Sequence, residues 1–156
     1  MEHPKAIGDR STLAIMLALC EAGYDLLVPF GENTRYDLVI DDGTRLARVQ
    51  CKTGRLRKGG ITFNTCSSYA HHPNPRVVRR DYRGQIDYFA VFCPETRRSY
   101  LIPIAEVPLK RQARLRVHPA RNNQQLGIRF AADFEIRQPG ITGEPGASAD
   151  ACRSSA

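Results

Sequence analysis

The sequence has no apolar run long enough to cross a membrane. The longest apolar stretch, residues 13–20, falls far short of the roughly 20 residues that a transmembrane helix requires. This stretch also lacks the flanking pattern of a secretion signal. We therefore expect a protein that has no membrane segment and resides in the cytoplasm.

Close cysteine pairs are absent as well. The chain has five cysteines and no CxxC motif, the cysteines being Cys20, Cys51, Cys66, Cys93 and Cys152. Their spacing matches no zinc ribbon or zinc finger. Several lie in apolar runs, where cysteine behaves as a small hydrophobic residue. This usage predicts a reducing compartment, which agrees with a cytoplasmic protein.

Acidic residues are the scarcer charged class. Lys and Arg number 23 against 16 Asp and Glu, which gives a formal net charge of +7. Residues 138–156 are slightly acidic, so the positive excess lies on residues 1–137. Such an excess favours a polyanionic partner, most simply nucleic acid. The alternative is that the charge serves solubility alone.

The 156 residues leave room for one domain of ordinary size, and no internal repeat is present. Residues 138–156 are rich in Gly, Pro, Ala and Ser and nearly free of large apolar side chains. A segment of this composition cannot bury enough surface to offset its loss of conformational entropy. We expect one folded domain over 1–137 and a disordered tail over 138–156.

Helix and strand patterns follow one another along the folded part. Apolar residues at helical spacing over 13–20 predict a helix that is capped by Asp9 or Ser11 and stopped at Gly23. A helix followed by an antiparallel meander and further helix indicates an α/β fold with a mixed sheet. The later segments are assigned in chain order: strands over 24–30, 36–40, 46–53, 61–65, 86–92 and 99–104, a short helix over 105–116, and a strand or helix over 128–136.

The sequence Asp-Asp-Gly-Thr at 41–44 is a strong signal for a hairpin turn. A two-residue turn at 42–43 places Asp37 opposite Arg48. Gln50 is then the diagonal neighbour of Asp37, with Cβ atoms about 7–8 Å apart. Because side chains alternate along a strand, one face carries Asp37, Arg48, Gln50 and Lys52. The other face is apolar and is expected to pack against the first helix, and it carries Leu38, Ile40, Ala47, Val49 and Cys51.

The polar face of this hairpin has the groups that phosphodiester hydrolysis requires. The carboxylate of Asp37 and the amide oxygen of Gln50 suit a magnesium ion, which prefers oxygen ligands. Lys52, one step further along the face, can reach an attacking water or a phosphate oxygen. The same spacing arises often by chance, so the alternative is a surface hairpin with an ordinary Asp–Arg pair and a solvated basic face.

Longer segments around these residues resemble a known family. The runs PFGENTRYDLVIDDG, RVQCKTGR, QIDYFAVFCPE and YLIPI are similar to PD-(D/E)XK endonucleases related to group I intron-encoded homing endonucleases. In that branch Gln replaces the acidic residue of the second motif, giving QxK. The resemblance covers roughly residues 6–137. It implies a restriction-endonuclease-like core, a central mixed β-sheet flanked by helices.

The resemblance also implies a function. It indicates a Mg²⁺-dependent endonuclease, with Mn²⁺ as a second usable ion, that hydrolyses phosphodiester bonds in double-stranded DNA. Asp37 and Gln50 match the metal ligands, the backbone carbonyl of Cys51 matches a further ligand, and Lys52 matches the catalytic lysine. An enzyme of this size that reads a long site usually needs symmetry, so we expect a homo-oligomer.

One family position departs from the pattern. The family usually has a Glu on the first helix, and Thr12 stands where that Glu is expected. The sequence is therefore compatible with an active endonuclease and with a catalytically weakened or inactive DNA-binding relative. A third possibility is a protein that uses its basic face against an acidic partner protein.

Basic residues near the hairpin are candidates for DNA contacts. We expect Arg48 and the basic turn at Arg55, Arg57 and Lys58 to contact phosphates. Arg79 and Arg80, with Tyr69 and Tyr82 nearby in sequence, fit a segment that tracks a DNA backbone or a solvated polar loop. Asp87 either orients a basic neighbour or simply begins a strand. The adjacent pair His71 and His72 suits a phosphate contact or a solvent-exposed loop better than a zinc site.

Overall fold

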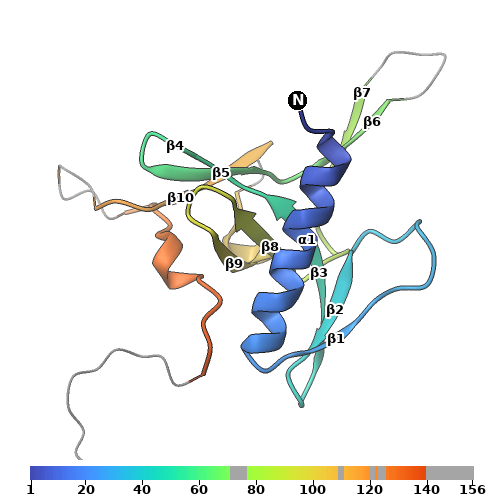
Figure 1. Ribbon diagram of the computed structural model, residues 1–156. Coiled ribbons are helices and arrows are strands. Elements are labelled where there is room, and N and C mark those ends of the chain that lie inside the picture. The colour runs from blue at the N-terminus through green and yellow to red at the C-terminus, as the bar shows by residue number, and fades with distance from the viewer. Residues whose placement is uncertain (71–76, 109–110, 120–121, 123–125, 140–156) are drawn as a thin grey trace, which may run out of the picture.

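The computed structural model describes residues 1–70, 77–108, 111–119, 122 and 126–139. Its centre is a five-stranded mixed sheet in the order β1-β2-β3-β8-β9, with only β3 and β8 parallel among the described pairs. The helix α1 (Pro4–Glu21) lies across one face (Figure 1). The predicted α/β class is confirmed. The five strands are β1 (Asp25–Leu27), β2 (Leu38–Asp41), β3 (Leu46–Thr53), β8 (Tyr88–Cys93) and β9 (Arg98–Pro103).

Two smaller sheets complete the described structure. One has the order β10-β5-β4 and the other pairs β6 with β7 in a hairpin that projects away from the central sheet (Figure 1). The predicted short helix over 105–116 is wrong, because this segment forms the 3₁₀ turn η1 (Ile104–Glu106) and then a strand paired with β5. These strands are β4 (Arg55–Arg57), β5 (Gly60–Asn64), β6 (Ser67–Ala70), β7 (Val77–Arg80) and β10 (Gln112–Arg116).

The helix begins earlier than its apolar spacing predicts. Its N-cap is His3, whose ring nitrogen accepts a hydrogen bond from the backbone N–H of Lys5 at 3.3 Å, and Pro4 occupies the first helical turn. Proline is favoured there because the first helical N–H groups have no partner within the helix. Asp9 and Ser11 therefore lie inside the helix rather than at its cap. The predicted stop at Gly23 is confirmed, with a positive φ of 94° directly after the C-cap.

The β2–β3 hairpin has a different register from the predicted one. Val39, not Asp37, lies opposite Arg48. The turn spans residues 42–45, because the Asp42 carboxylate accepts hydrogen bonds from the backbone N–H groups of Thr44 and Arg45 and so closes a longer loop. The register differs by two residues from the prediction, so each side chain stays on its predicted face.

The central sheet buries an apolar layer on each face. Toward α1, the layer combines two helix residues with the predicted apolar hairpin face: Ile15, Leu19, Leu38, Ile40, Ala47, Val49 and Cys51, with Ala90. The predicted packing of this face against the first helix is confirmed. The opposite layer joins β8 and β9 to β5 and β10, and includes Ile61, Phe63, Tyr82, Phe89, Val91, Ile102 and Leu115. β3 therefore packs on α1 through alternate residues, while Gln50 and Lys52 on its other face are half-buried.

A glycine makes the sharp passage from β3 into β4 possible. A Cβ atom at Gly54 would lie 2.6 Å from Cγ2 of Ile61 and 2.8 Å from Cγ1 of Val91. Its backbone N–H donates to the carbonyl of Phe92 at 2.8 Å. The sheet of β10, β5 and β4 can therefore pack closely on β8 at the end of β3.

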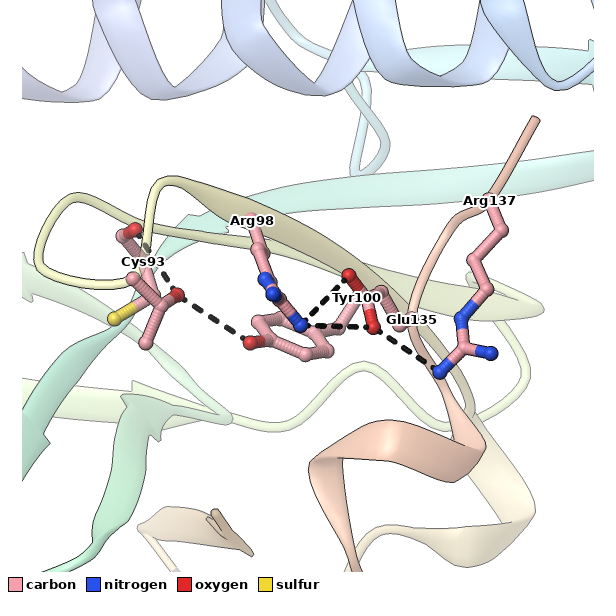
Figure 2. Close-up of polar contacts among 6 residues, drawn as sticks. Cys93, Arg98, Tyr100, Glu135 and Arg137 are labelled. Atoms are coloured by element: carbon pink, nitrogen blue, oxygen red, sulfur yellow. Dashed lines mark hydrogen bonds and ion pairs between the residues drawn. The ribbon is translucent and has the colours of Figure 1, made fainter. Parts of the chain in front are cut away.

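The segment after η2 (Ala131–Asp133) is fastened along β9. Phe134 and Ile136 exchange backbone hydrogen bonds with Leu101 and Ser99. Figure 2 shows the side-chain contacts. The Glu135 carboxylate forms ion pairs with the guanidinium groups of Arg98 and Arg137, each with an N–O distance of 3.3 Å. Residues 128–136, left open between strand and helix, form this 3₁₀ turn flanked by isolated bridges. Most of the predicted tail, residues 140–156, lies outside the described residues, as do His71 and His72.

Within the described part of the chain, no helix is long and apolar enough to span a bilayer.

Candidate active site

Asp37 is held against the QxK segment of β3. It lies just before β2, where its backbone N–H donates to the carbonyl of Val49 at 2.9 Å. Its carboxylate oxygen Oδ2 accepts a hydrogen bond from the backbone N–H of Cys51 at 2.8 Å. The carboxylate is thereby fixed at Cys51, the residue between Gln50 and Lys52. This holds although Arg48 lies opposite Val39 and not opposite Asp37.

The electrostatics at Asp37 favour a cation. The side chain is accessible to solvent, yet desolvation by the protein around it raises the pKa of Asp37, and the Cys51 N–H and the Lys52 charge only partly offset this. An ionised carboxylate in such a place is incompletely stabilised. A bound cation would supply the missing charge compensation.

Gln50, Cys51 and Lys52 alternate across β3. Gln50 and Lys52 are half-buried on one face, while the Cys51 side chain is buried among the residues packed on α1. Burial raises the pKa of the Cys51 thiol strongly, so its sulfur is protonated within the apolar layer packed on α1. In the described part of the chain the Gln50 amide has no hydrogen-bond partner, which leaves its oxygen available for a cation.

The donor set fits a hard divalent cation. Asp37 offers a carboxylate, Gln50 an amide oxygen, and Cys51 a backbone carbonyl, and Mg²⁺ and Mn²⁺ both prefer oxygen ligands. No group of three His, Cys, Asp or Glu side chains gathers anywhere in the described ranges. A metal at this place would therefore rest on a single carboxylate and would retain several waters.

Thr12, the helix position expected to carry a Glu, faces β3 from the α1 side of the sheet. Thr12 is half-buried on α1, and its hydroxyl contacts the Cys51 thiol and donates to the carbonyl of Gly8 at 3.1 Å. One residue earlier, the Ser11 hydroxyl lies 2.6 Å from the Thr53 hydroxyl and ties α1 to the end of β3. The helix is thus positioned over the QxK segment, but it brings no carboxylate there.

Lys52 is held by a residue that the sequence did not assign to the site. Its ammonium nitrogen donates to the hydroxyl of Tyr82 at 3.2 Å and lies 4.8 Å from the ring centre. Tyr82, which lies near Arg79 and Arg80 in sequence, is buried, with only 4% of it exposed. Arg35 contacts the same ring, with its guanidinium carbon 4.2 Å from the centre. No local pattern indicates either contact, because the residues that make them are far apart in the chain.

Arg48 is occupied by an intramolecular partner. Asp87 Oδ2 accepts hydrogen bonds from the backbone N–H of Arg48 at 2.7 Å and from its Nε at 3.3 Å, and Arg48 also donates to the carbonyl of Gly84. These contacts outweigh the effect of burial and hold the pKa of the Asp87 carboxyl below its usual value. Of the two roles considered for Asp87, the structure shows the orientation of a basic neighbour.

The other predicted DNA contacts are spread over different elements. Arg55 lies 3.8 Å from Glu95 in an ion pair, whereas Arg57 and Lys58 are exposed at the β4–β5 turn. Arg79 and Arg80 belong to β7, opposite Ser68 and Ser67. The basic residues predicted to contact DNA thus have separate surroundings. Arg57 and Lys58 remain the exposed pair.

The comparisons with known proteins agree with this arrangement. The sequence model of the PD-(D/E)XK endonuclease family matches residues 2–137, so the chain belongs to that family. Its fold is similar to that of a bacterial homing endonuclease, I-Ssp6803I, with a TM-score of 0.67 and 22% sequence identity over 86% of this chain and 89% of the other. The predicted restriction-endonuclease-like core is confirmed. No curated protein matches the sequence.

Proposed function

We propose that the chain is a divalent-cation-dependent enzyme that cuts double-stranded DNA at the site formed by Asp37, Gln50 and Lys52. The observation that carries this proposal is the 2.8 Å hydrogen bond from the Cys51 N–H to Asp37, because it fixes the carboxylate beside the QxK residues. The endonuclease family gives the reaction, which is hydrolysis of a phosphodiester bond.

Each side chain has a distinct role in the proposed reaction. Asp37, Gln50 and the Cys51 carbonyl would hold Mg²⁺ or Mn²⁺, which supplies charge neutralisation and a more acidic water when bound. Lys52 places a positive charge where negative charge develops on the phosphoryl oxygens as water attacks phosphorus and the sugar oxygen leaves. The Cys51 N–H keeps the Asp37 carboxylate in place.

A nicking assay on supercoiled plasmid tests this proposal. We expect relaxed and linear products with Mg²⁺ or Mn²⁺, and none when EDTA is present. Asp37→Ala should remove cleavage under the same conditions. Equal cleavage with and without EDTA, or full cleavage by Asp37→Ala, would contradict the assignment.

A second candidate is a DNA-binding protein that cuts weakly or not at all. The observation in its favour is Thr12, which occupies the helix position beside Cys51 without offering a carboxylate. Salt-sensitive DNA binding without cleavage in any divalent ion would support this candidate over the first.

Cleavage of both strands of a DNA duplex in a single binding event requires two active sites, one for each strand. One chain has one Lys52 site, so we propose that a symmetric homo-oligomer presents one site to each strand. Sedimentation of the purified protein measures this. A monomer that linearises DNA in a single binding event would contradict it.

A further inference from the structure

Two cations contact one buried aromatic ring beside the candidate active site. The Arg35 guanidinium carbon lies 4.2 Å from the centre of the Tyr82 ring, and the Lys52 ammonium lies 4.8 Å from it. Like charges that meet at one ring repel each other, and the negative face of the ring offsets part of that cost. The arrangement brings Lys52 to a defined position next to Asp37.

The Tyr82 ring cannot move freely. It is 4% exposed and meets Phe89 edge-on, with ring centres 5.5 Å apart and an interplanar angle of 89°. Its hydroxyl is the polar end of an otherwise apolar residue, and it accepts the hydrogen bond from Lys52 at 3.2 Å. A buried tyrosine usually requires a partner for its hydroxyl, and here that partner is the site lysine.

Arg35 is immobilised as firmly as the ring. Its Nε donates to Gln85 at 2.6 Å, and its two terminal nitrogens donate to Ser67 at 2.7 Å and to the Asp81 carbonyl at 2.8 Å. These partners are the first residue of β6 and two residues of the segment that follows β7. Arg35 itself precedes Asp37 by two residues. The guanidinium therefore links the Asp37 segment to the segment that carries Tyr82.

We propose that Tyr82 is a positioning residue for Lys52 and that Arg35 fixes Tyr82 in turn. This inference rests on the proposed function for its catalytic consequence, but not for its structural one. A lysine has a long flexible side chain, and holding its ammonium in one place before DNA binds removes an entropic cost from the reaction. Lys52 contacts both the ring and the hydroxyl, and only the hydroxyl offers a directional hydrogen bond.

The variant Tyr82→Phe removes the hydroxyl and keeps the ring, so it tests the two contacts with Lys52 separately. The variant keeps the buried ring and its contact with Phe89, and we expect it to fold. If the parent cleaves DNA, kcat should fall roughly tenfold, the scale of one hydrogen bond to a charged group, while KM stays within about twofold. Tyr88→Phe is the matched control, because Tyr88 packs on the helix side of the sheet, and it should change neither constant.

A second readout needs neither metal nor DNA. Reductive methylation, followed by mass spectrometry, reports how freely each lysine ammonium reacts. We expect Lys52 to react severalfold faster in Tyr82→Phe than in the parent or in Tyr88→Phe. The exposed Lys5 serves as the internal reference and should react at the same rate in all three proteins.

The two readouts keep this inference distinct from the proposed function. Faster Lys52 methylation in Tyr82→Phe supports the positioning role even if the parent protein cuts no DNA, an outcome that would overturn only the proposed function. An unchanged Lys52 methylation rate overturns the positioning role. A kcat equal to that of an active parent would also overturn it, as would a loss confined to KM.

Discussion

The Asp37 carboxylate accepts a hydrogen bond from the backbone N–H of Cys51 at 2.8 Å. This contact joins the chain just before β2 to the middle of the QxK segment on β3. It uses one carboxylate oxygen and leaves the other for a ligand. Asp37 is therefore positioned by main-chain geometry, so its placement depends on the fold of the hairpin rather than on other side chains of the site.

Neutralising Asp37 should remove activity without weakening the metal-free fold. The folded protein raises the pKa of Asp37 through desolvation, so the charged form costs stability as the pH rises above the usual carboxyl pKa. Asp37→Asn keeps an oxygen that can accept from Cys51 and removes that cost. In thermal unfolding at pH 7 with EDTA, we expect a Tm equal to or slightly above that of the parent.

The same variant should lose the response to metal. Mg²⁺ is expected to raise the Tm of the parent and not that of Asp37→Asn, because binding to the folded state stabilises it. A clear drop in the metal-free Tm of Asp37→Asn, or an unchanged response to Mg²⁺, would contradict this account of the carboxylate.

Placing a carboxylate at position 12 of α1 should strengthen Mg²⁺ binding at the candidate site. The Thr12 hydroxyl contacts the Cys51 thiol, and the Cys51 backbone N–H donates to Asp37, so the longer side chain of a Glu at position 12 would start beside the residue that holds Asp37. We expect Thr12→Glu to lower the Mg²⁺ concentration needed for half-maximal nicking by roughly tenfold, because a second carboxylate adds charge to the ligand set. Thr12→Gln has a similar shape without the charge and should not give this gain. Equal effects of both variants would count against the placement of Thr12 at the metal.

The ion pair between Arg48 and Asp87 should make stability depend on pH. Burial raises the pKa of Asp87, but the hydrogen bonds from Arg48 outweigh it and hold the pKa below the usual 3.8. The folded state therefore gains stability when Asp87 is ionised, and this gain is complete above the usual pKa and lost as the pH falls through the lower folded value.

Urea unfolding of Asp87→Asn measures that contribution. We expect the parent to be more stable by about 1 kcal/mol at pH 7, and the difference to shrink as the pH falls below about 4. Asp133→Asn, at an exposed carboxylate, should leave stability unchanged at pH 7. A difference for Asp87→Asn that grows toward low pH would show that the sign is wrong.

Two glycine substitutions should act in opposite directions. A Cβ at Gly54 would meet Ile61 and Val91 at 2.6 and 2.8 Å, so we expect Gly54→Ala to lower the free energy of unfolding by about 1–3 kcal/mol. Gly8 lies within α1 with no atom within 4 Å of its Cβ position, so Gly8→Ala should raise it by about 0.5–1 kcal/mol. Denaturant unfolding of both variants checks this. A tolerated Gly54→Ala would mean that the junction between β3 and β4 is looser than the structure indicates.

Sequence reasoning could propose the candidate site because its signals are local. The alternation along β3 places Gln50 and Lys52 on the face away from α1, and this holds even though the predicted hairpin register is off by two residues. The register was missed because the Asp42 side chain closes a turn over 42–45, a choice made by hydrogen bonds to Thr44 and Arg45. A one-residue error would have exchanged the two faces, whereas a two-residue error changes only which residues are opposite.

The contacts that were missed join distant parts of the chain. Tyr82 lies in a polar stretch with no periodicity, and nothing in its neighbours indicates that it is buried on Phe89 or bonded to Lys52. For Asp87, a basic neighbour was one of the two roles considered, but that this neighbour is Arg48 depends on the parallel pairing of β8 with β3. Residues 112–116 were assigned to a helix because their pairing with β5 is a tertiary contact that overrides local propensity.

The most direct test of the account is the effect of removing the Lys52 ammonium. Lys52→Ala and Lys5→Ala each delete one lysine, the first at the site and the second on the exposed first turn of α1. With Mg²⁺, we predict that Lys5→Ala nicks supercoiled DNA like the parent, while Lys52→Ala loses about 10²–10³-fold in rate and binds DNA within about threefold of the parent. Nicking by Lys52→Ala at the rate of Lys5→Ala would contradict the claim that this site cuts DNA.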